Sequence, residues 1–249
     1  MSDLIVSDDG PIRILRMNRP AKKNALTLAM YDAMAAAVEE SETNGAIRCL
    51  LIAGGPGSFC AGNDIGDFMK SANEGGALSP STLRFLYSLV RCEKPLVAAV
   101  IGVAVGVGTT MLLHCDYVVA AADARFSTPF VALGLTPEAA SSLIAPRLMG
   151  HANAFSLLVM GRPLNAGEAK ALGIVNTVVS AAEVEAEAMK AAREISDLPP
   201  EAVLASRRLM RGTGEEILAR IDEEAEEFKV RLKSPEARTA FTGFLTRKR

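Results

Sequence analysis

The stretch KPLVAAVIGVAVGVGTTMLLHCD, residues 94–116, constrains the fold of this chain more than any other segment. Nineteen consecutive residues within it, 95–113, have no charged side chain. The first half is β-branched and predicts a buried strand, and the second half, after Gly106 and Gly108, predicts a helix. In the turn between them, backbone can approach a ligand closely and helix N–H groups point outward. We therefore expect this turn to form half of an active site.

A membrane-spanning helix is the alternative for this stretch, because nineteen uncharged residues are long enough to cross a bilayer. A proline, several glycines and two threonines interrupt the run, its first half is β-branched, and no aromatic residues flank it. These features favour a buried strand followed by a buried helix. We expect no membrane partner.

Composition excludes several classes of function. A net charge of -2 over 249 residues, without clustered Lys or Arg, argues against a nucleic-acid partner. Two histidines and four scattered cysteines do not make a metal site, so we expect no metal and buried, reduced thiols. The N-terminal MSDLIVSDDG resembles neither a secretory signal nor a transit peptide, and the C-terminal TRKR is no peroxisomal address. A cytoplasmic location is the expectation.

The order of elements predicts an α/β fold. Residues 4–7 and 12–17 suggest a hairpin, and Thr27 can cap a helix that ends near residue 43. From residue 48, strands and helices alternate, which indicates a mostly parallel sheet whose loops 54–62 and 102–108 face one crevice. A short helix is expected at 67–71. The chain is mainly helical from residue 141, and we divide it into an α/β core, 1–197, and a helical C-terminal region, 198–249.

The two glycine-rich loops offer backbone donors. In FCAGND, Gly62 lets the backbone turn and leaves the Asn63 N–H available, and Gly106 does the same for the Val107 N–H in GVG. Two such N–H groups from separate loops would stabilise an oxyanion. Tight turns and close helix packing explain the same glycines, so both interpretations stay open at this point.

Glu138 is the most distinctive acid–base candidate. It lies in LGLTPEAASSLIA, with no cation within eight positions on either side, so its pKa should be raised toward that of a useful base. A first-turn acid at a helix N-terminus after Thr136-Pro137 is the alternative. Asp64 is expected to cap a helix, and Asp116 to satisfy backbone donors. The sequence contains no nucleophile elbow, Walker loop or Rossmann fingerprint.

Several motifs, in order, resemble the crotonase (enoyl-CoA hydratase/isomerase) superfamily. They are NRPAKKNALT, GSFCAGNDI, KPLVAAVIGVAVGVGTTMLLHCDYVVAAADARFSTPF, LGLTPEAASSLIAPRLMG and GRPLNAGEAKALGIVNTVV, and they cover about residues 10–180. The resemblance implies a spiral of ββα units followed by a helical trimerisation region. It also implies an acyl-CoA thioester as the substrate, with no separate cofactor because coenzyme A is part of that substrate. Assembly would be a homotrimer or a dimer of trimers.

The resemblance also implies roles for individual residues. The N–H groups of Asn63 and Val107 would hold the thioester oxygen, and Ala61 would contact the adenine end of coenzyme A through its backbone. Lys22 and Lys23 would lie near its phosphates, although a solvated loop pair is an equal alternative. The remaining residues that the resemblance places along the acyl-CoA site are Gly62, Asp64, Ile65, Gly106 and Phe130.

Departures from the family pattern bear on the reaction. Where the hydratases of the family have two glutamates, this chain has Thr110 and Phe130, so ordinary hydration is doubtful. The segment PFVALGLTPEAASS resembles the peroxisomal type of Δ3,Δ2-enoyl-CoA isomerase, whose single catalytic glutamate falls on Glu138. The expected activity is therefore a proton shift from C2 to C4 by Glu138. Hydratase-like chemistry, hydrolase or dehalogenase chemistry with a carboxylate nucleophile, and an acyl-CoA-binding protein without activity are the alternatives.

Overall fold

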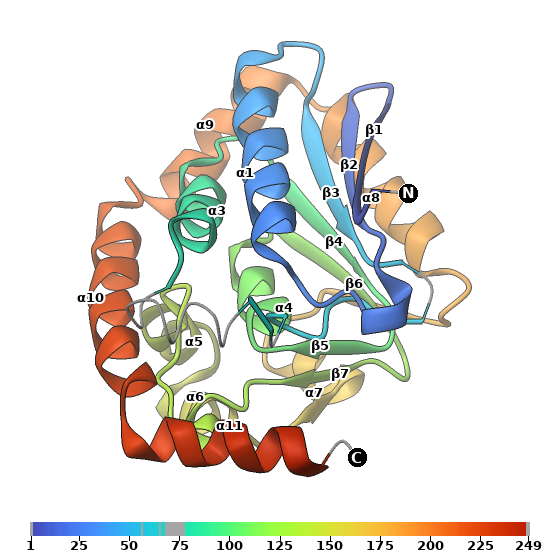
Figure 1. Ribbon diagram of the computed structural model, residues 1–249. Helices are drawn as coiled ribbons and strands as arrows, with labels where there is room; N and C mark the ends of the chain where they lie inside the picture. The colour runs from blue at the N-terminus through green and yellow to red at the C-terminus, as the bar shows by residue number, and fades with distance from the viewer. Residues whose placement is uncertain (1, 56, 65, 68–77, 248–249) are drawn as a thin grey trace.

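In the computed structural model, two layers of helices enclose a twisted, mostly parallel sheet (Figure 1). The structure describes residues 2–55, 57–64, 66–67 and 78–247, and for 244–247 it describes the backbone alone. The helix expected at 67–71 therefore lies almost wholly outside the described residues.

The main sheet has six strands in the order β1-β2-β3-β4-β6-β9. Only β1 and β2 pair antiparallel among the described strands of this sheet, as the predicted hairpin requires, and the other neighbours pair parallel. Every residue of β3 and β4 is buried, which explains their unbroken apolar sequences CLLIA and LVAAV. The strands are β1 Leu4–Asp9, β2 Ile12–Met17, β3 Cys49–Ala53, β4 Leu96–Val100, β6 Tyr117–Ala121 and β9 Thr177–Val179.

A second, smaller sheet was not expected from the sequence. It consists of β5 Val103–Val105, β7 Arg125–Ser127 and β8 Leu164–Asn165. Strands of two or three residues are too short to show an alternating pattern, so periodicity could not reveal them. This sheet continues directly from the end of β4 and holds the second glycine-rich loop beside the first.

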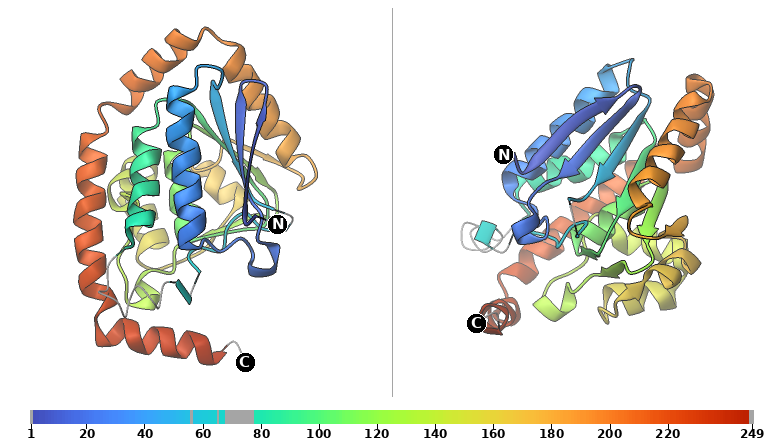
Figure 2. Two further views of the ribbon diagram at one scale, coloured as in Figure 1. Left: turned by 45° about the horizontal axis from the view of Figure 1, so that its top comes forward. Right: turned by 90° about the vertical axis from the view of Figure 1, so that its right-hand side faces the viewer.

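Helices cover both faces of the main sheet (Figure 2). On one face lie α1 Leu28–Thr43 and α3 Pro80–Arg91, and α8 Val184–Asp197 lies on the other. The Thr27 hydroxyl accepts a hydrogen bond from the Met30 N–H at 3.2 Å, so the predicted cap of α1 is confirmed. The helix predicted after the turn at 106–108 is shorter than expected: α4 Val107–Thr110 tightens into the 3-10 helix η2 Met111–His114.

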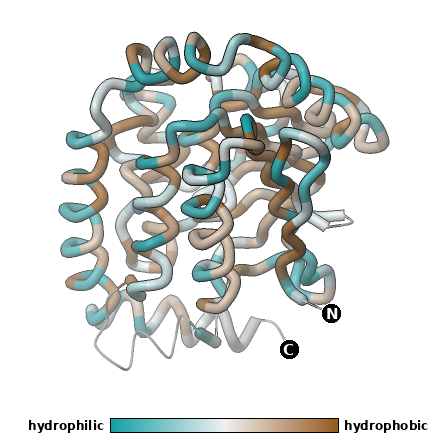
Figure 3. The backbone as a smooth tube through the Cα atoms, turned by 90° about the horizontal axis from the view of Figure 1, so that it is seen from above, coloured by the Kyte–Doolittle hydropathy of each residue, from teal (hydrophilic) through white to brown (hydrophobic). Residues whose placement is uncertain are grey.

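The second half of the chain is mainly helical, as predicted. The turn η3 precedes α5, and α9 begins two residues beyond the proposed boundary at 197/198. Hydrophobic segments follow the inner strands, whereas the outer helices alternate between hydrophilic and hydrophobic residues (Figure 3). No described helix is both long and apolar enough to cross a bilayer. The remaining elements are η1 Pro20–Lys22, η3 Val131–Leu133, α5 Ser141–Met149, α6 His151–Leu158, α7 Ala166–Ala171, α9 Pro200–Arg211, α10 Glu215–Leu232 and α11 Pro235–Arg247.

Candidate active site

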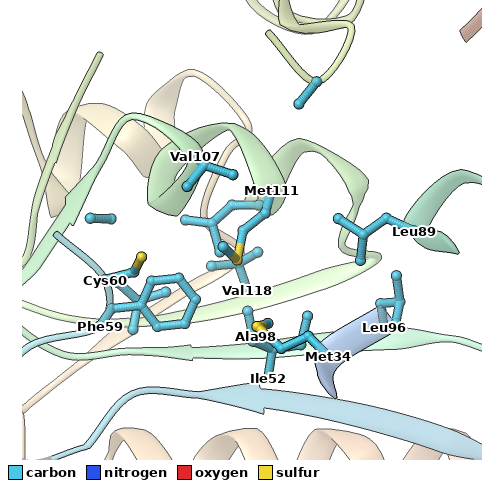
Figure 4. Packing of buried hydrophobic residues seen from close by; sticks show 14 of the residues in the cluster. Met34, Ile52, Phe59, Cys60, Leu89, Leu96, Ala98, Val107, Met111 and Val118 are labelled. Atoms are coloured by element: carbon cyan, nitrogen blue, oxygen red, sulfur yellow. The ribbon is translucent and has the colours of Figure 1, made fainter. Parts of the chain in front are cut away.

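The two glycine-rich loops lie side by side at the carboxyl ends of β3 and β4. The Cys60 N–H donates to the Val103 carbonyl at 3.0 Å, and the Val105 N–H donates to the Cys60 carbonyl at 2.9 Å. Packing is so close that a Cβ on Gly108 would come within 2.6 Å of the Cys60 carbonyl oxygen. The two loops thus lie side by side, as their positions after neighbouring parallel strands predicted. Figure 4 shows the buried side chains of Phe59, Cys60 and Val107 that support them.

Two backbone N–H groups at these loops remain available. Gly62 has φ of 90° and Gly106 has φ of 56°, conformations that favour glycine, and each directly precedes a donor residue, Asn63 and Val107. Within the described part of the chain, no acceptor receives a hydrogen bond from either the Asn63 or the Val107 N–H. Two such donors are what an oxyanion-binding site requires, and the Val107 N–H is also one that the start of α4 leaves without an intrahelical acceptor.

A side-chain hydrogen bond positions Asn63, the first of these donor residues. Tyr31 on α1 is fully buried, and its hydroxyl donates to the Asn63 Oδ1 at 2.6 Å. This hydrogen bond fixes the Asn63 side chain and leaves its backbone N–H free. This contact could not be predicted from the sequence, because Tyr31 fits the apolar face of the helix 28–43.

Glu138 lies buried within reach of the same region. Only 2 % of its surface is exposed, and its Oε1 accepts a hydrogen bond from the Thr110 hydroxyl on α4 at 2.5 Å. The other oxygen, Oε2, is buried and has no partner among the described residues. Glu138 therefore presents one anchored oxygen and one free oxygen, which is the arrangement that a positioned general base needs.

Burial raises the pKa of Glu138 to about 8, which confirms the direction expected from its apolar sequence context. The Thr110 hydroxyl opposes this rise because it stabilises the carboxylate, and the negative charge of Glu224 adds to it. Burial raises the pKa of both Tyr31 and Cys60, and the charge of Glu138 adds to the rise in each. Glu138 is therefore close enough to Tyr31 and Cys60, which support the first loop, for its charge to affect their pKa values.

Comparisons with known proteins identify the family of this chain. The sequence model of the enoyl-CoA hydratase/isomerase family matches residues 9–249. The chain belongs to the crotonase superfamily. It is 35% identical to rat enoyl-CoA delta isomerase 2 over 253 residues, covering 98% of this chain and 64% of the rat protein. The chain thus spans just under two thirds of that relative.

Solved structures of similar sequence share the fold. Pseudomonas aeruginosa OdaA is 44% identical, with a TM-score of 0.94 and coverage of 98% of this chain and 99% of that chain. An enoyl-CoA hydratase/isomerase from Pseudoalteromonas atlantica T6c is 40% identical, with a TM-score of 0.93 and coverage of 99% and 98%. These similarities confirm the predicted family and its α/β spiral.

The alternative role for Glu138 as a first-turn helix acid is wrong. In this crotonase chain α5 begins at Ser141, and Ala140 is the N-cap residue, so Glu138 precedes the helix. Its backbone carbonyl accepts hydrogen bonds from the Ser141 N–H at 3.1 Å and the Ser141 hydroxyl at 2.6 Å. The backbone of Glu138 thus helps to start the helix, while its side chain points to Thr110.

Asp64 and Asp116 both have structural partners. The Asp64 carboxylate accepts from the Gly66 N–H at 2.9 Å and from Arg19 at 2.7 Å, which leaves it less suited to bind a ligand, and the helix that it was expected to cap lies mostly outside the described residues. Asp116 accepts from the Leu96 N–H and from Arg207, both at 2.8 Å, at the opposite end of β4 from the site. Neither carboxylate is free to act on a substrate.

The residues assigned to coenzyme A lie together near the first loop. Lys22 and Lys23 are exposed at the end of η1, and the Lys23 carbonyl accepts from the Ala61 N–H at 3.0 Å. Because that N–H is occupied, a backbone contact from Ala61 to a ligand would have to use its carbonyl oxygen. Ile65 lies outside the described residues.

Two further positions distinguish this crotonase chain. Phe130 is buried, and its ring lies 3.9 Å from where a Cβ on Gly106 would stand, so it flanks the second loop. Thr110 was noted in the sequence only as a missing carboxylate, yet it is the hydrogen-bond donor to Glu138. Because Thr109 precedes it in the same short helix, the sequence contained no local signal that set Thr110 apart.

Proposed function

We propose that this protein is a Δ3,Δ2-enoyl-CoA isomerase. The observation that supports this most directly is the buried Glu138, with one oxygen held by Thr110 and the other free. A raised pKa suits a group that must both accept and return a proton near neutral pH. The rat relative named enoyl-CoA delta isomerase 2 supports the same assignment by similarity.

The proposed reaction needs one base and an oxyanion site. The Glu138 carboxylate removes a proton from C2 of a 3-enoyl-CoA, and the electron pair of that C–H bond delocalises into a dienolate. The negative charge on the thioester oxygen is held by the N–H groups of Asn63 and Val107. Glu138, now a carboxylic acid, returns the proton to C4, so that the double bond ends between C2 and C3. Atoms and charge balance without water or a cofactor.

The arrangement around Glu138 favours this proton shift over hydration. Hydration in the family uses a second carboxylate, and the described carboxylate whose charge acts on Glu138 is Glu224. Both oxygens of Glu224 already accept backbone hydrogen bonds, from Ala140 and Ser142. Phe130 and Thr110, at the positions of the hydratase glutamates, provide an apolar wall and a hydroxyl instead. A dry site would also protect the dienolate from side reactions.

Replacing Glu138 by glutamine tests the proposal. Glutamine keeps the size and the hydrogen bond from Thr110 but cannot accept the C2 proton. With 3-hexenoyl-CoA as substrate, we expect the formation of conjugated 2-enoyl thioester, followed by its absorbance, to fall by about two to four powers of ten. Binding of hexanoyl-CoA, measured by calorimetry, should stay within a few-fold of the wild-type value.

Controls separate this proposal from its alternatives. Glu227→Gln, an exposed change on α10, should leave the rate unchanged. Crotonyl-CoA hydration, run beside the isomerase assay, should be slow in the wild type. Full isomerase activity of Glu138→Gln, or faster hydration than isomerisation in the wild type, would refute the proposal. An acyl-enzyme ester trapped on Glu138 would instead support a carboxylate nucleophile.

A further inference from the structure

We propose that Glu224, on the C-terminal helix α10, is a positioning residue for Glu138. It lies 86 positions away in the sequence, yet it binds the backbone immediately after Glu138. Its Oε2 accepts from the Ala140 N–H at 2.6 Å, and its Oε1 accepts from the Ser142 N–H at 2.9 Å. This inference rests on the proposed function, because it assigns Glu224 a role in placing the proposed base.

The backbone that Glu224 binds is held in a costly conformation. Ala139 and Ala140 have φ of 62° and 53°, the left-handed region in which a Cβ is disfavoured. Two successive alanines persist there only where their surroundings impose the conformation. Because Glu138 directly precedes this turn, the direction in which its side chain leaves the backbone depends on the turn.

A single peptide group in this turn is held at both ends. The carbonyl of Ala139 accepts a hydrogen bond of 2.8 Å from His114 Nε2, and the N–H of the same peptide group is the one donated to Glu224. A carbonyl can only accept, so Nε2 of His114 must bear the hydrogen. Burial lowers the pKa of His114 to about 4, which keeps the ring neutral. The peptide plane between Ala139 and Ala140 is thus fixed by one residue of η2 and one of α10.

Glu224 also acts on Glu138 through its charge. Glu224 is 6 % exposed, and its negative charge adds to the rise that burial causes in the pKa of Glu138. The titratable groups that face Glu138 from the other elements are Tyr31 on α1 and Cys60 in the first loop, and burial keeps both neutral below about pH 10. Arg220 faces Glu224 from the same helix.

A merely structural role for Glu224 is the competing explanation. Ala140 has no side-chain acceptor for the first N–H groups of α5, so Glu224 also serves as the cap of that helix. Capping alone predicts a loss of stability. Positioning predicts, in addition, a change in how Glu138 titrates and a loss of rate that depends on Glu138 being present.

The test uses Glu224→Gln in the full chain. The amide keeps one acceptor and removes the charge, so kcat with 3-hexenoyl-CoA, measured at high pH where Glu138 is ionised in both proteins, should fall about ten- to hundredfold, with KM within about threefold. Removing the negative charge should lower the pKa of Glu138, so the acid limb of kcat against pH should move to lower pH. Glu227→Gln, on the exposed side of the same helix, is the matched control and should change neither quantity.

Two further measurements make the result decisive. In a double-mutant cycle, Glu224→Gln should add little to the loss already caused by Glu138→Gln, because it acts through that side chain. Carboxyl-carbon NMR, with the Glu138 signal assigned by its loss in Glu138→Gln, should report the lowered pKa of Glu138 independently of activity. Glu224→Asp, which keeps the charge, should leave the acid limb in place while lowering kcat.

The outcomes distinguish this inference from the proposed function. An active wild type whose kcat and acid limb are unchanged in Glu224→Gln would overturn the inference and leave the isomerase proposal intact. A wild type without isomerase activity would refute the proposed function, and the NMR titration would still decide whether Glu224 acts on Glu138. Additive losses in the cycle, or unfolding of both Glu224→Gln and Glu224→Asp, would make Glu224 a structural residue only.

Discussion

Replacing Thr110 by valine should move the acid limb of isomerisation to higher pH. The Thr110 hydroxyl donates to the Glu138 Oε1 at 2.5 Å in a fully buried setting. Burial raises the pKa of Glu138 to about 8, and this hydrogen bond keeps the rise from being larger. Valine has nearly the same shape but no hydroxyl, so it removes the hydrogen-bond donor while Glu138 stays buried. The carboxylate loses stabilisation, and its pKa should rise further.

The size of the effect follows from the strength of the hydrogen bond. Hydrogen bonds to charged groups are worth about 1.5–3 kcal/mol, and one pKa unit corresponds to about 1.36 kcal/mol, so a rise of about one to two units is expected. With a pKa of about 8, roughly a tenth of the wild-type sites hold a carboxylate at pH 7. In Thr110→Val that fraction should be about ten- to hundredfold smaller, and kcat at pH 7 should fall in proportion.

The assay is the initial rate at saturating 3-hexenoyl-CoA between pH 6 and pH 10, corrected for spontaneous thioester hydrolysis. At the highest pH the valine variant should approach the wild-type rate, since the stronger base then exists as its carboxylate. Thr110→Ser keeps the hydroxyl and should retain the wild-type profile. A rate loss that is equal at every pH, or an acid limb that moves to lower pH, would show that Thr110 does not stabilise the Glu138 carboxylate.

Two further substitutions test the site. The folded state disfavours ionised Glu138, whereas the unfolded chain ionises near pH 4.5, so this group costs stability increasingly between pH 4.5 and pH 8, on the order of 5 kcal/mol at most. Urea unfolding should therefore show Glu138→Gln gaining stability over the wild type from pH 5 to pH 8.5, and a difference independent of pH would contradict the raised pKa. Tyr31→Phe leaves the Asn63 Oδ1 without its buried donor, so the variant should lose about 1–3 kcal/mol of unfolding free energy and about tenfold in kcat. A kcat unchanged from wild type would show that the Asn63 loop does not need this contact.

The sequence was most informative where the local pattern and the tertiary environment agree. The runs CLLIA and LVAAV are buried on both faces of a parallel sheet, and no other element suits so many apolar residues in succession. The absence of cations around Glu138 predicted its raised pKa, because desolvation there is not offset by a nearby positive charge. Both predictions depend on neighbours in the sequence.

Contacts between distant segments could not be predicted in the same way. The Tyr31–Asn63 and Thr110–Glu138 hydrogen bonds join residues about thirty positions apart, and neither hydroxyl departs from the pattern of its helix. Glu224 is different, because it occupies an apolar stripe of α10 that includes Ile221 and Phe228 at helical spacing. A buried carboxylate must have hydrogen-bond or ion-pair partners, so the position of Glu224 on this apolar stripe indicated a contact with another segment of the chain.

The resemblance predicts that the C-terminal helices form a trimerisation region. Within one chain, Ile221 and Phe228 of α10 are buried, and α11 packs so closely on the loop after η3 that a Cβ on Gly134 would lie 2.7 Å from the Ala237 nitrogen. Glu224 extends the same packing to the backbone beside Glu138. α10 and α11 therefore pack against the segment that contains the proposed base, Glu138. A substitution that displaces these helices should lower kcat more than it disturbs the main sheet.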